Sequence, residues 1–358
     1  MPRDVVVVVR TDAKPRPAEV LDTLLVSTSS EQPLQTFRSL DAIATVYPTD
    51  TTTYKQAATL FNQGNTTLAS SLIRRVKIVG FDLQTNDAGT EIIERLEELQ
   101  DEDNDWYCFL TDQNDTETIT ALAAWAEDTE PTEVELDEGA EDHRKLYFCT
   151  TSVKTPFITN RRTVIAYSAD PDECLDAAWL GNVGPFYPQS VTYKFKLPQG
   201  CAVHPLSEAE RDVLIEGHVN FMAREYKHEY MKEGVCADGE YIDVQMGADW
   251  IARAMREELY KCLMANPKVP YTDEGFALIA SCVMSTLDRA TGLHIIAREP
   301  DSGRGLIKID IPLRRDATDD EVRNRRMPNI TWEAQLEGAI HHVKIIGTLR
   351  ATLSQLAA

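Results

Sequence analysis

The sequence contains no apolar run close to the ~20 residues that a membrane-spanning helix needs. Its opening, MPRDVVVVVR, has too few apolar residues for a signal peptide. Neither membrane insertion nor secretion is therefore indicated. We expect a soluble chain that is made in the cytoplasm.

Signatures of catalysis are missing as well. The sequence has no phosphate-binding loop G-x-x-x-x-G-K-[ST], no G-x-G-x-x-G after an expected strand, no G-x-S-x-G and no H-E-x-x-H. Each motif supplies a particular chemical group, so their absence removes the usual evidence for nucleotide-binding, hydrolase and zinc-peptidase functions. We expect no catalytic residue, no cofactor and no metal.

Cysteine is sparse, with seven residues that are widely spaced and odd in number. Most lie in expected apolar strands or helices, which indicates buried thiols in a reducing compartment rather than a disulfide framework. The cysteines are Cys108, Cys149, Cys174, Cys201, Cys236, Cys262 and Cys282.

Basic residues are nearly absent from one long segment. Between Asp82 and Asp142 there are 22 acidic residues and one basic residue, Arg95, so this segment carries −21 of the formal net charge of −22. An acidic surface repels nucleic acid and anionic lipid. We expect no nucleic-acid partner and interpret the segment as a solvated, outward-facing region.

The first half of the chain alternates short apolar strands with helical patterns. This alternation predicts an α/β domain with a mostly parallel sheet over residues 21–185, ending near Gly184 and Pro185. The expected strands are LDTLLVST, LIRRVKIVGF, DWYCFLTD, KLYFCTT and RTVIAYS. The expected helices are YKQAATLFNQ, GTEIIERLEELQ, TETITALAAWAE and DECLDAAWLGN.

The second half predicts an α+β inner domain over residues 186–340. An expected strand, SVTYKFKLP, is followed by a strand pair after Asn220 with a turn near Glu233 and Gly234. From Asp249 the apolar period becomes 3.6, which predicts a long helix, and a second helix is expected from Asp273. Its later expected strands are GLIKIDIPL and NITWEAQLEGAI.

Capping boxes with the pattern S/T-x-x-E predict two short helices, one starting at Ser207 and one at Thr318.

Both ends of the chain carry strands without a local partner. Val5, Val6, Val7, Val8 and Val9 are apolar on both faces and precede a proline-broken stretch. A second terminal strand is expected at 342–348, with apolar side chains from Val343, Ile345 and Ile346. Because backbone groups of buried strands must be paired, we predict that residues 1–20 and 341–358 are arms that add to a neighbouring subunit's sheet.

Three stretches carry a resemblance to a known family. ADGEYIDVQMGADWI, NPKVPYTDEGFALI and RRMPNITWEAQLEGAIHHVKIIGTL resemble the inner domain and closing strands of bacteriophage contractile tail sheath proteins, of the short type. The resemblance covers roughly residues 186–349, and the N-terminal half only in outline.

The resemblance implies a structural protein of the virion. Sheath subunits form stacked hexameric rings around a tail tube protein, meet baseplate and tail terminator proteins at the ends, and shorten to drive the tube through the host envelope, leading to genome ejection. It implies assembly in the host cytoplasm and strand arms exchanged between subunits. Contractile bacteriocins and related injection machines share the fold, so phage and non-phage particles both stay open.

An enzyme is the alternative interpretation. α/β folds place ligands at the carboxyl ends of their strands, so an enzyme of unknown type with a site there stays open.

Weak metal-site patterns are also present. Asp101, Asp103, Asp105 and Asp112 are spaced like ligands of an EF-hand loop, but Trp106 stands where the loop needs glycine. Adjacent His341 and His342 point to opposite faces of an expected strand. Two further pairs lack supporting ligands or a shared face, namely His218 with His228 and Glu240 with Asp243.

Arg323, Arg325 and Arg326 form a basic cluster in an otherwise acidic protein. One interpretation is a solvated helix end that complements the helix dipole. The other, on which our prediction rests, is a tube-facing cluster that grips the tail tube through exposed charge pairs.

Overall fold

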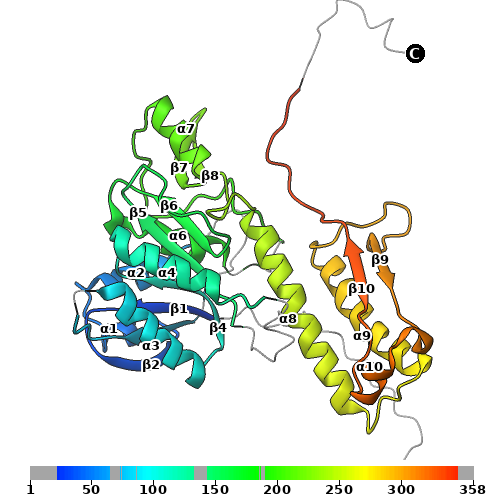
Figure 1. Ribbon diagram of the computed structural model, residues 1–358. Helices are drawn as coiled ribbons and strands as arrows, with labels where there is room; N and C mark the ends of the chain where they lie inside the picture. The colour runs from blue at the N-terminus through cyan, green and yellow to red at the C-terminus, as the bar shows by residue number, and fades with distance from the viewer. Residues whose placement is uncertain are drawn as a thin grey trace, which may run out of the picture.

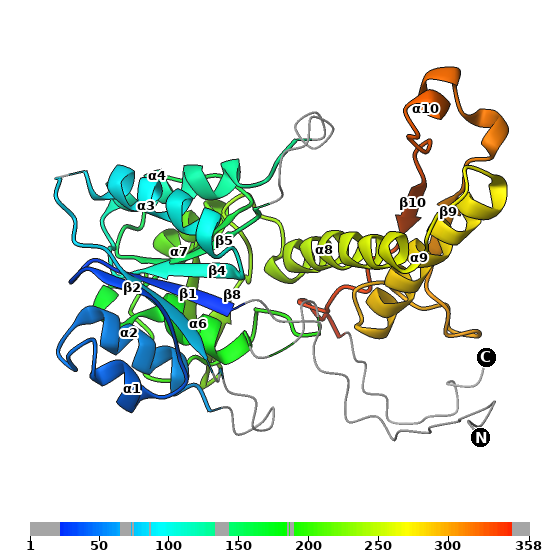
Figure 2. The same cartoon turned by 90° about the horizontal axis from the view of Figure 1, so that it is seen from below.

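The computed structural model describes residues 22–64, 73, 75–85, 87–132, 143–184, 186 and 190–345. Its main body is an eight-stranded sheet between helices, and a long helix joins this body to a smaller second unit (Figure 1, Figure 2). Val5 to Val9 and Ile346, which we predicted to lie in exchanged arms, are outside the described residues.

The large sheet is mostly parallel, as the alternation of elements predicted. Every neighbouring pair from β3 to β7 is parallel, and β2 and β8 pair antiparallel at the two edges. Its strands in spatial order are β2 (Gln32–Phe37), β3 (Val76–Gly80), β1 (Asp22–Ser27), β4 (Trp106–Thr111), β5 (Leu146–Thr151), β6 (Thr163–Tyr167), β7 (Asn220–Glu225) and β8 (His228–Lys232).

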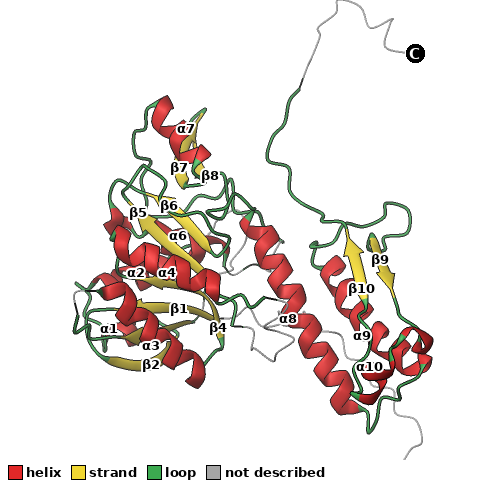
Figure 3. Cartoon of the chain, viewed as in Figure 1, coloured by secondary structure: helices red, strands yellow, loops and turns green. Residues whose placement is uncertain are grey.

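Helices cover both faces of this sheet (Figure 3). On one face lie α1 (Leu40–Ala44), α2 (Thr52–Phe61) and α6 (Leu175–Val183), and on the other α3 (Ala88–Glu102), α4 (Thr116–Asp128) and α7 (Glu208–Glu216). Strands β3, β5 and β6 are buried along their whole length, which explains their continuous apolar sequences. We call this body the α/β layer.

The α/β layer extends past the boundary that we expected at residue 185, because β7 and β8 join its sheet. Their hairpin turns at Tyr226 and Lys227, with φ values of 49° and 74°, and not near Glu233 and Gly234. Two central residues with positive φ fit a two-residue hairpin turn that favours Asn and Gly, so the Tyr-Lys pair gave no turn signal. The expected strand at 190–198 does not form.

The second unit begins along α8 (Ile242–Ala265), which starts before the expected residue, Asp249. The C-terminal half of α8, together with the elements after it, is called the distal unit. The later elements are α9 (Asp273–Gly292), β9 (Ile307–Asp310), α10 (Asp319–Arg323) and β10 (Thr331–Ala334). Two short 3-10 turns, η1 (Pro171–Glu173) and η2 (Arg314–Asp316), complete the described elements.

Antiparallel strands β9 and β10 form a sheet of two strands, with one half-buried face against the helices and one exposed face. The core of the distal unit is small. Its main cluster of packed, buried apolar residues consists of Ile251, Val283, Leu287, Ala290, Ile295 and Ile296. A two-stranded sheet on so few buried side chains is marginally stable by itself.

Local signals at helix starts were reliable. The predicted capping boxes are both present, from Ser207 to Glu210 and from Thr318 to Glu321. Within the described residues, no helix has the length and apolar character needed to cross a membrane.

Candidate functional site

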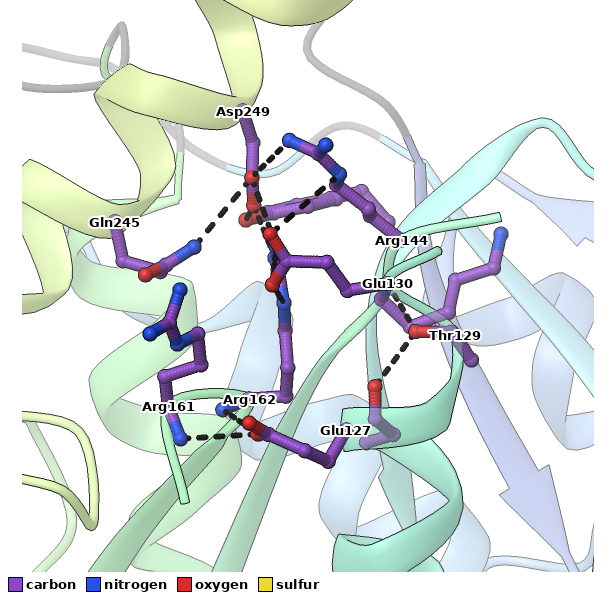
Figure 4. Close-up of polar contacts among 11 residues, drawn as sticks. Glu127, Thr129, Glu130, Arg144, Arg161, Arg162, Gln245 and Asp249 are labelled. Atoms are coloured by element: carbon purple, nitrogen blue, oxygen red, sulfur yellow. Dashed lines mark hydrogen bonds and ion pairs between the residues drawn. The ribbon is translucent and has the colours of Figure 1, made fainter. Parts of the chain in front are cut away.

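The N-terminal half of α8 meets the amino ends of β4, β5 and β6 through charged side chains (Figure 4). Arg162 immediately precedes β6 and its side chain is fully buried. Its guanidinium donates to both carboxylate oxygens of Asp249 on α8, and its Nε donates to Glu130 at 2.9 Å. Because a buried charge is costly unless it is paired, these two carboxylates make the burial of Arg162 possible.

Asp249 also accepts hydrogen bonds from other side chains. The hydroxyl of Tyr107 on β4 donates to it, as does Arg144 at 3.3 Å from Nη1 to Oδ1. Gln245, one turn earlier on α8, donates at 3.4 Å. We call Tyr107, Glu130, Arg144, Arg162 and Asp249 the junction cluster. It fixes the position of α8 on the α/β layer.

Two members of the junction cluster, Arg162 and Tyr107, have shifted pKa values. Burial lowers the pKa of Arg162, but the charges of Asp249 and Glu130 and the hydrogen bond to Asp249 outweigh it and raise the pKa overall. Burial, followed by the charge of Asp249, raises the pKa of Tyr107 well above its ordinary value. Arg162 therefore stays charged and Tyr107 stays a hydrogen-bond donor, so the cluster is suited to holding elements together.

A cleft of about 390 Å³ opens beside the junction cluster. Lys145 lines it, with its amine 2.7 Å from the carbonyl of Trp106 and 3.7 Å from the centroid of the Trp106 ring. Burial lowers the pKa of Lys145 to about 7. Because this amine donates to the carbonyl of Trp106, the first residue of β4, it ties the amino ends of β4 and β5 together.

The carboxyl ends of the strands, where an enzyme of this fold would hold its ligand, contain a closed polar network. Asp112 accepts hydrogen bonds from the backbone and hydroxyl of Thr28 and from the hydroxyl of Thr53. Thr53 also bonds Ser27 at 2.6 Å. Asp176 on α6 is buried, which raises its pKa to about 6, and it accepts from the side-chain amide of Gln56 on α2 at 3.4 Å. These side chains join β1, β4, α2 and α6 to one another.

The predicted tube-facing arginines lie together at the end of α10. Arg323, Arg325 and Arg326 are all exposed, and Arg325 has a positive φ of 54° where the helix ends. The hydroxyl of Tyr271 holds this segment through the carbonyl of Arg326 at 2.8 Å. Their role at a tube stays a prediction.

The C-terminal segment returns from β10 to the α/β layer. His341 Nε2 lies 2.7 Å from the hydroxyl of Thr192, and the imidazole packs edge-on against Tyr241, with ring centroids 4.8 Å apart. Beyond it, Val343 and Ile345 are 74% and 86% exposed and belong to no strand. The arm residues that the structure describes therefore present apolar surface to solvent.

The weaker sequence candidates have structural explanations. Asp103 accepts a hydrogen bond from Lys77 at 2.7 Å, at the end of α3. His341 and His342 lie in no strand, contrary to our expectation. Among the described residues there is no group of three or more His, Cys, Asp or Glu side chains arranged to hold a metal ion.

Known structures share the fold of this chain. A chain in the anti-feeding prophage baseplate, 6-fold symmetrised, superposes with a TM-score of 0.68 at 12% identity, covering 98% of this chain and 100% of that chain. A chain of the anti-feeding prophage helical sheath in its contracted state gives 0.64 at 11% identity, covering 98% and 100%. A third, from the contracted baseplate, gives 0.62 at 12% identity, covering 97% of each chain.

The protein shares the fold of these anti-feeding prophage sheath and baseplate chains. The resemblance read from the sequence is therefore confirmed at the level of the fold, over nearly the whole chain. No family model and no curated protein matches the sequence. At 11 to 12% identity the likeness rests on the arrangement of elements rather than on shared residues.

Sequence reasoning missed the junction cluster. We placed the start of the long helix at Asp249, where an aspartate is normally a cap, although it lies within α8 on the buried face. Arg162 was hidden by an apolar strand sequence. An acidic residue on the apolar face of a helix, together with an arginine entering a buried strand, is the signal that was available.

Proposed function

We propose that this protein is a structural subunit of a contractile injection particle, most specifically a sheath subunit that forms stacked hexameric rings around a tube. The observation that supports this best is the match in fold to sheath and baseplate chains over 97 to 98% of the sequence. A match of that extent includes the arrangement of the α/β layer and the distal unit, and not only a common α/β sheet.

The shape of the chain suits this role. α8 has 24 residues, so it is about 36 Å long, and it carries the distal unit away from the α/β layer (Figure 2). In the proposed ring, the distal units lie at small radius near the tube and the α/β layers lie outside. The acidic surface of α3 then faces solvent, where its like charges are screened within about 10 Å. Its exposed acids are Glu94, Glu97, Glu98, Asp101 and Glu102.

The strand arms provide the links between subunits in this proposal. Val5 to Val9 and 342–348 extend the β9–β10 sheets of neighbouring subunits, whose backbone edges need partners. The subunits then stay joined while the rings rotate during contraction. The energy for contraction is held in subunit packing, which needs no nucleotide.

Partners follow from the same proposal. Arg323, Arg325 and Arg326 contact a tail tube protein, and the ends of the sheath meet baseplate and tail terminator proteins. Assembly takes place in the cytoplasm of the producing cell, and the finished particle is a virion or a related injection machine.

Electron microscopy of two purified forms tests the function. The full chain, alone or co-expressed with a tube protein, should form rings or tubes. The chain without residues 1–14 should be folded and soluble, with the circular dichroism and thermal transition of the full chain, yet should form no tubes. A full chain that stays a monodisperse monomer or dimer in both settings would contradict the proposal and favour an enzyme.

A further inference from the structure

The β7–β8 hairpin ends in two bulky residues whose backbone conformation is unfavourable for them. Tyr226 and Lys227 form its two-residue loop, since Glu225 and His228 are the last residues that pair across the strands. The φ values of the loop are 49° and 74°. Such a loop favours Asn and Gly, because in most other residues the Cβ atom lies too close to the backbone at positive φ. We call Tyr226 and Lys227 the hairpin tip, and its turn is strained.

Contacts within the chain hold other residues that have positive φ. Phe195 packs against an aromatic ring of β8 with 5.3 Å between the ring centroids, and the imidazole of His294 lies 2.8 Å from a glutamate. The hairpin tip differs. Tyr226 is 96% exposed, and within the described part of the chain neither residue of the tip has a side-chain hydrogen bond, ion pair or ring contact. The single chain therefore gains no such contact from the strained turn.

Lys227 gives the hairpin tip a positive charge. The acidic side chains of the two strands already pair with other cations of the hairpin, Glu229 with Arg224 and Glu225 with Lys232. An exposed tyrosine is a side chain that contributes strongly to protein interfaces, and a neighbouring cation favours an acidic partner surface. The tip thus has the chemistry of a contact with an acidic protein surface.

The acidic surface of α3 lies at the opposite edge of the large sheet. Glu94, Glu97 and Asp101 are exposed and three or four positions apart, so they form one row on the helix. Arg95 on α3 pairs with Glu31, which precedes the edge strand β2, whereas the hairpin tip belongs to the other edge, at β8 (Figure 1). Complementary surfaces on opposite edges let identical subunits join head to tail, and such contacts build rings or helices.

We propose that the hairpin tip docks on the acidic surface of α3 in a second copy of this chain, and that this contact is the reason for the strained turn. The proposal rests on the function proposed above, because the contact forms between subunits of one assembly. It joins neighbouring α/β layers directly, in addition to the links that the strand arms provide. The tip consists of two residues, so most of the acidic surface stays in solvent.

The first test replaces the tip by the residues that its turn favours. The full chain carrying Tyr226→Asn and Lys227→Gly loses both the strain and the contact, so we expect two opposite effects. The melting temperature of the free subunit should rise by about 2 to 4 °C. The protein concentration needed for tubes or rings, measured by pelleting and electron microscopy, should rise at least about tenfold. Lys227→Arg keeps the charge and is the control that should assemble like the unmodified chain.

The second test identifies the partner surface. Lys227→Glu places a negative charge against the acidic surface and should weaken assembly, and Glu94→Lys with Glu97→Lys in the same chain should restore it. A photoreactive benzophenone amino acid in place of Tyr226 should cross-link to the α3 peptide of a second copy. Mass spectrometry of the digested product maps this cross-link.

The outcomes separate this contact from the proposed function. Unchanged assembly of the Asn-Gly variant would overturn the contact and leave the function in place, whereas an unmodified chain that never assembles would overturn both. A lower melting temperature of the Asn-Gly variant would show that the turn is not strained and would remove the basis of the proposal. Cross-links only to a tube protein or to another surface of the chain, or no recovery with the two lysines, would contradict the partner named here.

Discussion

The α/β layer and the distal unit differ in how completely each buries its own strands. The two faces of the large sheet pack against clusters of 25 and 24 buried apolar residues, whereas the cluster between α8, α9 and the small sheet has six. Strands β5 and β6 are buried throughout, but β9 and β10 alternate between half-buried and exposed residues. The layer buries its strands on both faces, and the distal unit leaves one face of its strands exposed.

α8 belongs to both regions and is attached to them differently. At its N-terminal end the junction cluster holds it by buried, multiply bonded charges. At its C-terminal end Leu263 and Met264 are 52% and 76% exposed. The helix is therefore rigidly placed on the layer, while its far end presents apolar surface of the kind that assembly covers.

Breaking the junction cluster should give the largest effect. Asp249→Ala removes the main partner of buried Arg162, and we expect the free energy of unfolding to fall by about 3 to 5 kcal/mol because an uncompensated charge stays buried. Thermal unfolding followed by circular dichroism measures it.

The matched control for this change is Arg224→Ala, which breaks an ion pair with Glu229 on the exposed β7–β8 hairpin. We expect a loss of at most about 1 kcal/mol. Equal losses in the two variants would show that the junction cluster does not hold α8 to the layer.

Shortening a buried side chain in each region should show whether the α/β layer and the distal unit unfold independently. Phe148→Ala on β5 and Leu287→Ala on α9 each remove a fully buried side chain. We expect Phe148→Ala to cost about 3 to 5 kcal/mol in the main transition, because the layer supplies most of the folded structure. Leu287→Ala should cost about 2 to 5 kcal/mol locally, seen as faster amide hydrogen exchange in α9. If both shifted one shared transition equally, the two regions would unfold as a single unit.

The smallest expected effect concerns pH and the C-terminal segment. Burial lowers the pKa of docked His341, and Lys194, His342 and Lys196 lower it further against the opposing charge of Glu233. The neutral imidazole is therefore the form that docks. Docking should be complete above the ordinary pKa of 6.5 and should be lost as the pH falls through the lowered value.

Fluorescence anisotropy of a probe at the C-terminus measures this docking. The signal should drop on acidification, and His341→Ala should give the low value at every pH. A pH-dependent drop that persisted in His341→Ala would assign the response to another group.

Most helices and strands of the α/β layer could be predicted from the sequence, because each depends on residues close together in the chain. Examples are the continuous apolar strand β5 and the capping residue Ser207. The sequence did not predict that β7 and β8 join the large sheet, because β6 and β7 pair although they are more than 50 residues apart in the chain. The junction cluster was not predicted for the same reason, since Arg162 and Asp249 are 87 positions apart in the chain.

The structure of the distal unit was hard to predict from the sequence for a different reason. Sequence patterns predict which face a strand buries, but β9 and β10 each leave one face exposed in the described part of the chain. The strand expected at 342–348 shows this most clearly, because residues 342–345 form no strand in the single chain. In the arm exchange that we propose, this pairing would come from a neighbouring subunit.

Amide hydrogen exchange in free and assembled protein tests most directly whether neighbours complete the distal unit. We predict that β1 and β4 to β6 are equally protected in both states, because the α/β layer is complete in the free chain. β9, β10 and residues 342–345 should exchange rapidly in the free subunit and become protected by at least about tenfold, or about 1.4 kcal/mol, in the assembled particle. Equal exchange of β9 and β10 in the two states would contradict the account.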